Sequence, residues 1–178
     1  MGEWEEQRRA LVDGAAQYVL RHGLTGLSLR PLAAALGTSD RMLLYYFSSK
    51  DELVGEVLRA LSAGLQGLLA ASIPDARVPV ARLVAAADAL LAQPELRPSG
   101  AVSLELFGLA ARGTEPYASA AAAILGEWID WAEQRIAGPA RGRRARAIGA
   151  VACIEGMLVL RGTGHDAGLP RAVTALLR

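Results

Sequence analysis

The chain has 178 residues, of which 19 are basic and 18 are acidic, so its formal net charge at pH 7 is +1. Apolar residues make up 52% of the sequence, which allows a sizeable buried core and excludes a disordered chain. The single cysteine, Cys153, excludes an intramolecular disulfide framework and is typical of a protein in a reducing compartment. We interpret Cys153 itself as a small buried hydrophobe.

Neither a targeting segment nor a membrane span is expected. Residues 1–9 are charged and lack the apolar core of a signal peptide. One long stretch with little charge, residues 147–160, has only 14 residues and contains Glu155. A helix needs about 20 apolar residues to cross a bilayer. The sequence therefore predicts a cytoplasmic protein without a membrane partner.

The sequence predicts an all-α fold. β-branched residues are sparse, asparagine is absent, and the strong helix formers alanine, leucine, arginine and glutamate dominate. Glycine, proline and serine residues interrupt the helical pattern and mark the ends of its segments. The helices are expected at residues 4–22, 29–36, 39–47, 51–71, 78–92, 100–112, 115–137, 141–161 and 169–178.

Residues 28–47 have the pattern of a helix-turn-helix, in which Ser28 is expected to cap the first helix. Two short expected helices are joined by a tight turn at Gly37-Thr38, which is the spacing found in DNA-binding proteins. Leu36, Leu43 and Phe47 fall on one side at helical spacing and can dock on the first expected helix. The pattern predicts that the opposite side of the second helix in the pair is exposed.

That opposite side carries four residues at positions i, i+3, i+4 and i+7, which we call the recognition stripe: Thr38, Arg41, Met42 and Tyr45. An arginine there can bridge guanine O6 and N7, and a methionine can pack on thymine methyl groups. Residues 21–50 contain four basic side chains and one acidic one, a local charge of +3. For Arg41 the simpler alternative is a solvated side chain in a surface ion pair.

Residues 10–54 resemble the N-terminal DNA-binding domain of the TetR family of transcriptional regulators. The matching residues are Ala16, Gly23, Ser28, Leu32-Ala33, Leu36-Gly37, Thr38-Ser39, Leu43, Tyr46-Phe47 and Ser49 to Leu53. The resemblance implies a three-helix DNA-binding domain at residues 1–50. It also implies a helical domain at residues 51–178 that binds an effector and dimerises.

The resemblance also implies which side chains contact DNA. They are Ser28, Arg30, Thr38, Ser39, Arg41, Met42, Tyr45, Tyr46 and Lys50. Ser28, Tyr45 and Lys50 are expected on phosphates, where the N-terminus of the following helix assists Lys50. The family usually has a tyrosine where Leu44 stands here, and we expect Tyr45 to replace it. For Tyr46 a position in the core is the favoured alternative.

The last two long helices, 115–137 and 141–161, have the apolar content for an antiparallel hairpin. Pairing with a second copy would give a four-helix bundle, in which Gly149, Ala152 and Gly156 allow close approach. The resemblance implies dimerisation of this kind, which the helical periodicity permits.

An effector pocket is expected in the second half of the chain. Its candidate residues are Leu104, Glu105, Phe107, Trp128, Trp131, Glu155 and Met157. Core packing is the alternative for the apolar members, and an ion pair with Arg112 or Arg161 is the alternative for the two glutamates. Otherwise a glutamate could orient a hydrophobic ligand that carries a donor or a positive charge.

The expected function is that of a DNA-binding regulator: a ligand-responsive repressor that binds a palindromic operator as a homodimer. The alternative is a helical DNA-binding or interaction protein without an effector. No enzyme motif such as Gly-x-Ser-x-Gly or a P-loop is present. His22 and His165 have no partners at metal-ligand spacing, so neither a metal nor a cofactor is expected. The basic cluster at residues 141–146 is interpreted as a solvated helix face.

Overall fold

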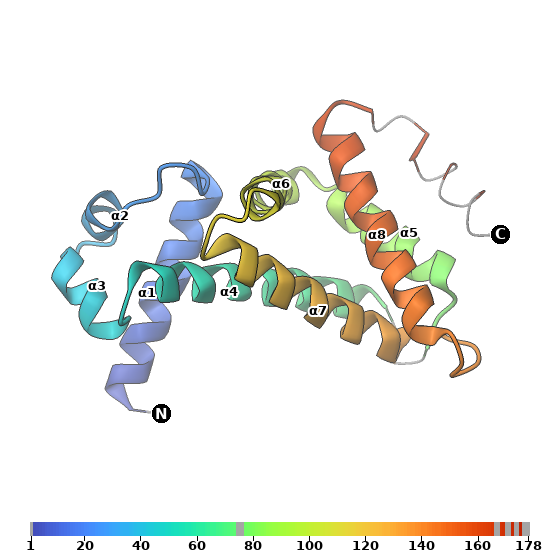
Figure 1. Ribbon diagram of the computed structural model, residues 1–178, viewed down its shortest axis with the longest axis horizontal. Helices are drawn as coiled ribbons and strands as arrows, with labels where there is room; N and C mark the ends of the chain where they lie inside the picture. The colour runs from blue at the N-terminus through green and yellow to red at the C-terminus, as the bar shows by residue number, and fades with distance from the viewer. Residues whose placement is uncertain (1, 74–76, 166–167, 170–171, 173–174, 176–178) are drawn as a thin grey trace. The chain divides into compact units, whose positions relative to one another are not determined.

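The computed structural model describes residues 2–73, 77–165, 168–169, 172 and 175 (Figure 1). These residues form eight α-helices and one 3-10 helix, and no strand occurs among them, which confirms the expected all-α fold. The helices are α1 (Glu3–His22), α2 (Leu29–Ala35), α3 (Asp40–Tyr46), α4 (Lys50–Ser72), α5 (Val80–Leu91), η1 (Pro94–Leu96), α6 (Arg97–Ala111), α7 (Tyr117–Arg135) and α8 (Arg143–Gly162).

The chain divides into two compact units. The first unit contains Met1–Gly64 and Ala101–Ala121, and the second contains Leu65–Gly100 and Ala122–Arg178. Helices α4, α6 and α7 each contribute residues to both units. The helix that the sequence predicts at residues 169–178 lies largely outside the described residues.

The first eight expected helices are present, with ends that shift by at most three residues. The largest differences have local causes. Helix α5 begins at Val80 because Val78 N donates to Arg135 O at 2.8 Å and Val78 O accepts from Ala137 N at 2.8 Å. This isolated bridge also ends α7 at Arg135. Helix α6 begins at Arg97, directly after η1, because Pro98 fits the first turn of a helix.

The core of the first unit is built around α1. Its buried residues repeat at helical spacing, and side chains from α2, α3 and α4 are buried with them. They are Leu11, Val12, Ala15, Ala16, Val19, Leu32, Ala33, Leu43, Leu53, Val54, Val57 and Leu58. Leu36 lies so close to Gly14 that a Cβ atom there would be 2.6 Å from Leu36 Cδ2. This small residue therefore lets the helix-turn-helix approach α1.

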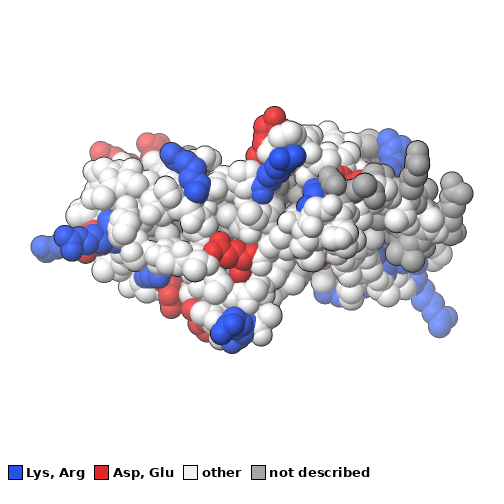
Figure 2. Space-filling model, turned by 90° about the horizontal axis from the view of Figure 1, so that it is seen from above, with Lys and Arg blue, Asp and Glu red and all other residues white. Residues whose placement is uncertain are grey.

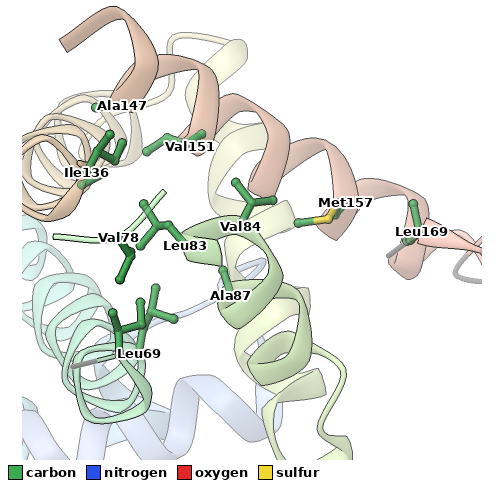
Figure 3. Close-up of a cluster of buried hydrophobic side chains, with 13 residues drawn as sticks. Leu69, Val78, Leu83, Val84, Ala87, Ile136, Ala147, Val151, Met157 and Leu169 are labelled. Carbon is green, nitrogen blue, oxygen red and sulfur yellow. The ribbon is translucent and has the colours of Figure 1, made fainter. Parts of the chain in front are cut away.

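The core of the second unit is a cluster of aliphatic side chains from α4, α5, α7 and α8 (Figure 3). Leu83 and Val84 of α5 are fully buried, and Figure 3 shows side chains such as Ile136 and Val151 pointing toward them. Asp88 of α5 is also buried, and its carboxylate accepts a hydrogen bond from Arg161 of α8 in an ion pair. Because α5 packs along α8, these contacts give the unit a continuous interior.

Among the described helices, α4 alone is long and apolar enough to span a bilayer. Its buried residues in the first unit, such as Leu53 and Val57, belong to a protein core instead. Ion pairs of Glu52 and Glu56 with Arg8 occupy its first turns. The first half of α4 therefore belongs to the core of the first unit.

The connection between α1 and α2 is held by a carboxylate from α6. Glu105 Oε2 accepts a hydrogen bond from Leu24 N at 2.6 Å, and Oε1 accepts from Thr25 N at 2.7 Å and from the Thr25 hydroxyl. Partial burial would raise the pKa of Glu105, but these donors outweigh burial and lower it. Gly23 has φ 76° and ψ −175°, a region that is essentially restricted to glycine.

Gly23→Ala is expected to destabilise the first unit by roughly 2–3 kcal/mol, because of the strained backbone and a Cβ placed 2.8 Å from Glu105 Oε2. The matched control is Gly26→Ala, where φ is also positive at 78° but no atom lies within 4 Å of the Cβ position. This control should cost only about 1–2 kcal/mol. Urea denaturation measures the free energy of unfolding of both variants. Equal losses would show that displacing the Glu105 carboxylate does not destabilise the fold.

Candidate nucleic-acid interface

Helices α2 and α3 form a helix-turn-helix that is packed onto α1 (Figure 1). Gly37 has φ 66°, and Thr38 N donates to Ala33 O at 2.9 Å, so the turn between the helices is tight. Ser39 Oγ accepts a hydrogen bond from Met42 N at 3.1 Å and thereby caps α3. Ser28 stands at the N-cap position of α2, but its hydroxyl makes no capping hydrogen bond, unlike the sequence-based expectation.

Helix α3 has one buried side and one exposed side. Leu43 and the C-cap residue Phe47 are 0% and 1% exposed, as the sequence predicts. On the other side Met42 is 42% exposed and Tyr45 is 67% exposed. Arg41 is also exposed. Large apolar groups on a seven-residue helix are costly to leave in water, so this surface is suited to contact with another molecule.

The basic side chains near α3 are available to a ligand. Arg30, Arg41 and Lys50 form no ion pair with any residue in the described part of the chain. The alternative in which an ion pair occupies Arg41 therefore has no support in the geometry. Figure 2 shows acidic and basic side chains interspersed on one face of the molecule, so net charge alone does not mark the interface.

Two of the candidate tyrosines differ in their surroundings. Tyr45 projects from α3 and meets only the edge of Tyr46, at a centroid distance of 5.2 Å, among the ring contacts of the described residues. Tyr46 is half-buried and also lies 5.7 Å from the Trp4 ring. Leu44 is 46% exposed beside them. The exposed phenol available on α3 is therefore that of Tyr45.

Lys50 begins α4, whose first turn is capped by side chains. Ser49 Oγ accepts from Glu52 N at 3.1 Å, while Glu52 Oε2 accepts from Ser48 N at 2.8 Å and from the Ser48 hydroxyl. The Ser48 hydroxyl and amide hold the pKa of Glu52 below its usual value. This arrangement fixes the start of α4 and with it the position of Lys50.

Sequence reasoning did not identify Arg8 of α1. Its guanidinium binds Glu52 and Glu56 of α4 and the backbone carbonyl of Tyr46 at the end of α3. These partners are 38 to 48 residues away in the chain. Local periodicity carries no signal for such contacts, and only the charge opposition between α1 and α4 could have indicated them.

The seven candidate effector-binding residues are divided between the units. Leu104, Glu105 and Phe107 lie in the first unit, where Glu105 binds the connection after α1 instead of Arg112. The others lie in the second unit. Met157 is 3% exposed within the aliphatic cluster, and Trp128 and Trp131 pack against that cluster with centroids 5.6 Å apart.

Glu155 of α8 is the candidate with an unusual environment. Its Oε2 is buried and has no hydrogen-bond partner among the described residues. Arg161, the partner considered from the sequence, is paired with Asp88 instead. Burial raises the pKa of Glu155 to about 7. A carboxyl in this state can donate a hydrogen bond when protonated or bind a cation when ionised.

The tight turn, the exposed side of α3 and the basic side chains without acidic partners among the described residues are the features of a DNA-binding helix-turn-helix. Residues 11–57 match the sequence model of the bacterial regulatory proteins of the tetR family. This segment, which holds the helix-turn-helix, thus matches the TetR family, as its resemblance implied. No curated protein matches the chain in sequence.

Solved structures support the same fold over the full length. A chain described as a TetR-family transcriptional regulator from Rhodococcus sp. is 16% identical, with a TM-score of 0.76, and the match covers 98% of this chain and 100% of that one. A transcriptional regulator from Saccharomonospora viridis, solved in complex with choline, is 18% identical at TM-score 0.65, with 97% and 95% covered. The multidrug binding protein EbrR, complexed with imidazole, is 20% identical at TM-score 0.67, with 97% and 95% covered.

Arg41→Ala is expected to weaken binding to a specific duplex by roughly 1–3 kcal/mol and to relax the preference at one base pair. Lys50→Ala should weaken binding to all duplexes and reduce the salt dependence by about one unit. Fluorescence anisotropy at several salt concentrations measures both effects. The control is Arg82→Ala, an exposed arginine of α5 in the second unit, which loses the same charge. If all three variants behaved alike, the recognition stripe would not be the interface.

Proposed function

We propose that the protein is a ligand-responsive repressor that binds a palindromic operator as a homodimer. The observation that carries this proposal is the exposed side of α3, on which Arg41, Met42 and Tyr45 are accessible while Leu43 and Phe47 anchor the helix. Arginine and methionine at adjacent positions suit the hydrogen-bonding and methyl groups of a major groove. Thr38 and Ser39 directly precede α3, and the start of a recognition helix is the part that contacts bases, which supports their assignment to base contacts.

Backbone contacts to DNA complete the proposed interface. Ser28 has a hydroxyl that is not used for capping, and Arg30 follows it in the first turn of α2. Tyr45 and Lys50 supply a phenol and a cation at the two ends of the α3–α4 connection. Such contacts set the register of a protein on a duplex and carry no sequence information. Tyr46 is included among the proposed DNA contacts only because its ring lies beside that of Tyr45.

The homodimer is proposed to form through α8. Ile148 and Val159 are 48% and 49% exposed, and they share a face with Ala152. Gly149 and Gly156 lie on the same face, and a Cβ atom at either position would meet nothing within 4 Å. An exposed apolar helix face with small residues is suited to close packing against a second copy. Two copies of α3 would then address two half-sites.

Residues 1–50 are proposed as the DNA-binding domain, and residues 51–178 as the effector-binding and dimerisation domain. Because α4 contributes to both compact units, it is the element through which an effector could change the position of α3. A ligand shifts this equilibrium only by its different affinity for the DNA-binding and the released conformations. We propose a cytoplasmic regulator without enzymatic activity.

We propose that the effector is a hydrophobic molecule with a positive charge or a hydrogen-bond donor, recognised by Glu155. The buried and unpartnered Oε2 supports this assignment, as does the choline bound by the regulator from Saccharomonospora viridis. Trp128 packs against the aliphatic cluster of the second unit and can supply an aromatic face for a cation, whereas the Trp131 ring already lies 4.5 Å from the Arg135 guanidinium carbon. A thermal-shift screen of hydrophobic amines should yield ligands that stabilise the wild type but not Glu155→Gln.

The function as a whole is tested by selecting bound duplexes from a random pool. A dimeric repressor should enrich one inverted repeat whose half-sites are separated by one helical turn or a multiple of it. Enrichment of a single asymmetric site would contradict the dimeric arrangement. Retention of all duplexes alike would favour a DNA-binding protein without specific control.

Ala152→Glu on α8 is expected to disrupt the dimer, because the interface would then bury an unpaired carboxylate. Light scattering at micromolar concentration should give twice the subunit mass for the wild type and a lower mass for the variant. Ala85→Glu, on the exposed side of α5, is the matched control and should remain dimeric. A wild-type mass of one subunit would contradict the proposed assembly.

Glu155→Gln is expected to change how stability depends on pH. The folded-state pKa of about 7 lies above the usual value of 4.5, so the folded protein binds more protons than the unfolded chain between these values. The wild type should therefore lose stability relative to the variant as pH rises from 5 to 8, by at most about 3 kcal/mol. Urea denaturation at fixed protein concentration measures this, with the exposed Glu127→Gln as control. Parallel pH profiles for wild type and Glu155→Gln would contradict a buried carboxyl.

A further inference from the structure

Arg8 of α1 is held tightly by two glutamates of α4. Its Nη1 donates to Glu56 Oε2 at 2.6 Å and its Nη2 donates to Glu56 Oε1 at 2.7 Å. Nη2 also donates to Glu52 Oε1 at 3.0 Å. The paired hydrogen bonds use the planar fork of the guanidinium, a geometry that fixes direction as well as distance. The bonds to Glu56 are the main reason that the pKa of Arg8 is raised above its usual value.

The same guanidinium holds the end of α3. Arg8 Nε donates to the carbonyl oxygen of Tyr46 at 3.2 Å, and Tyr46 is the last residue of α3. The guanidinium carbon also lies 4.8 Å from the centroid of the Phe47 ring. Carbonyl groups in the last turn of a helix lack partners within the helix, so Arg8 satisfies one of them. One rigid side chain thus connects the end of α3 with α4.

The accessible part of Arg8 does not belong to the recognition stripe. It opens into a groove of about 660 Å³ that is lined by residues of α1 and α4. These residues are Trp4, Glu5, Arg8, Arg9, Val12, Asp13, Glu56, Arg59, Ala60 and Ala63. Among the described lining residues none comes from α2 or α3. Arg8 therefore contacts the end of α3, at Tyr46 and Phe47, and in the described part of the chain it makes no hydrogen bond or ion pair with the recognition stripe.

We propose that Arg8 is a positioning residue for operator binding, which fixes the end of α3 against α4 and so sets the orientation of the recognition stripe. The inference rests on the proposed function of that stripe, and it adds a residue that does not itself touch DNA. Because α4 continues into the second unit, a displacement of α4 reaches α3 through the Arg8 contacts.

A lysine cannot replace Arg8 in this position. An ammonium group has the same charge but cannot make the paired hydrogen bonds to Glu56 while it also reaches Tyr46 O and stacks on Phe47. Arg8→Lys therefore separates charge from geometry. Arg8→Met keeps the apolar stem and removes both. Arg59→Met is the control for lost charge in the same groove, because Arg59 is half-exposed and lies 3.7 Å from Glu56.

The test compares these variants with the wild type by fluorescence anisotropy, on the inverted repeat selected by the wild type and on an unrelated duplex. Both Arg8 variants should bind the operator on the order of tenfold more weakly, as for the loss of one base contact. Their affinity for the unrelated duplex and their salt dependence should stay close to those of the wild type. Arg59→Met should bind both duplexes like the wild type. Circular dichroism at the assay temperature confirms that each variant is folded.

The outcomes are distinguishable. A loss of affinity for both duplexes with a smaller salt dependence would show that Arg8 is a phosphate contact and would overturn the proposal. Folded Arg8 variants with wild-type affinity and specificity would assign Arg8 to stability alone, again overturning it. If Arg8→Lys bound the operator as tightly as the wild type, operator binding would depend on the charge of residue 8 and not on its geometry, and the proposal would be overturned. Failure of the wild type to select any operator would instead contradict the proposed function.

Discussion

The docking of α3 through Leu43 and Phe47 is the contact on which the rest of this structure depends. A seven-residue helix has too few internal hydrogen bonds to persist alone, so tertiary packing must hold it. With those two side chains buried, helical geometry turns Arg41, Met42 and Tyr45 outward. The Ser39 cap at one end of α3 and the Arg8 hydrogen bond at the other then fix its length and direction. The chemical character of the exposed side follows from this anchoring.

Two carboxylate contacts connect the helix-turn-helix to helices that continue into the second unit. Glu105 of α6 binds the connection after α1, and Glu52 and Glu56 of α4 bind Arg8. In both, a charged group is satisfied by several donors, which makes the contact directional as well as strong. Directional contacts of this kind can transmit a displacement, whereas aliphatic packing alone tolerates sliding. In the ligand-responsive repressor that we propose, such connections would carry the effect of a ligand to α3.

The sequence predicted the helix-turn-helix well because its signals are local. The turn at Gly37, the burial of Leu43 and Phe47 and the exposure of Arg41, Met42 and Tyr45 all follow from helical periodicity and turn chemistry. Contacts between distant segments could not be predicted in this way. Glu105 accepts a hydrogen bond from Leu24, which is 81 residues away in the sequence. Arg161 pairs with Asp88, 73 residues away, and not with Glu155, which is nearer in the sequence. The start of α5 at Val80 likewise depends on the bridge from Val78 to Ile136. The DNA-contacting and effector-binding residues remain predictions, because no contact within the chain tests them.

The central claim, that the exposed side of α3 is the surface that meets DNA, is tested most directly by mapping amide chemical shifts of isotope-labelled protein during titration with its selected duplex. The account predicts that the largest changes fall within residues 28–50 and are strongest along α3. Changes confined to the basic residues at the start of α8, with α3 unaffected, would contradict it.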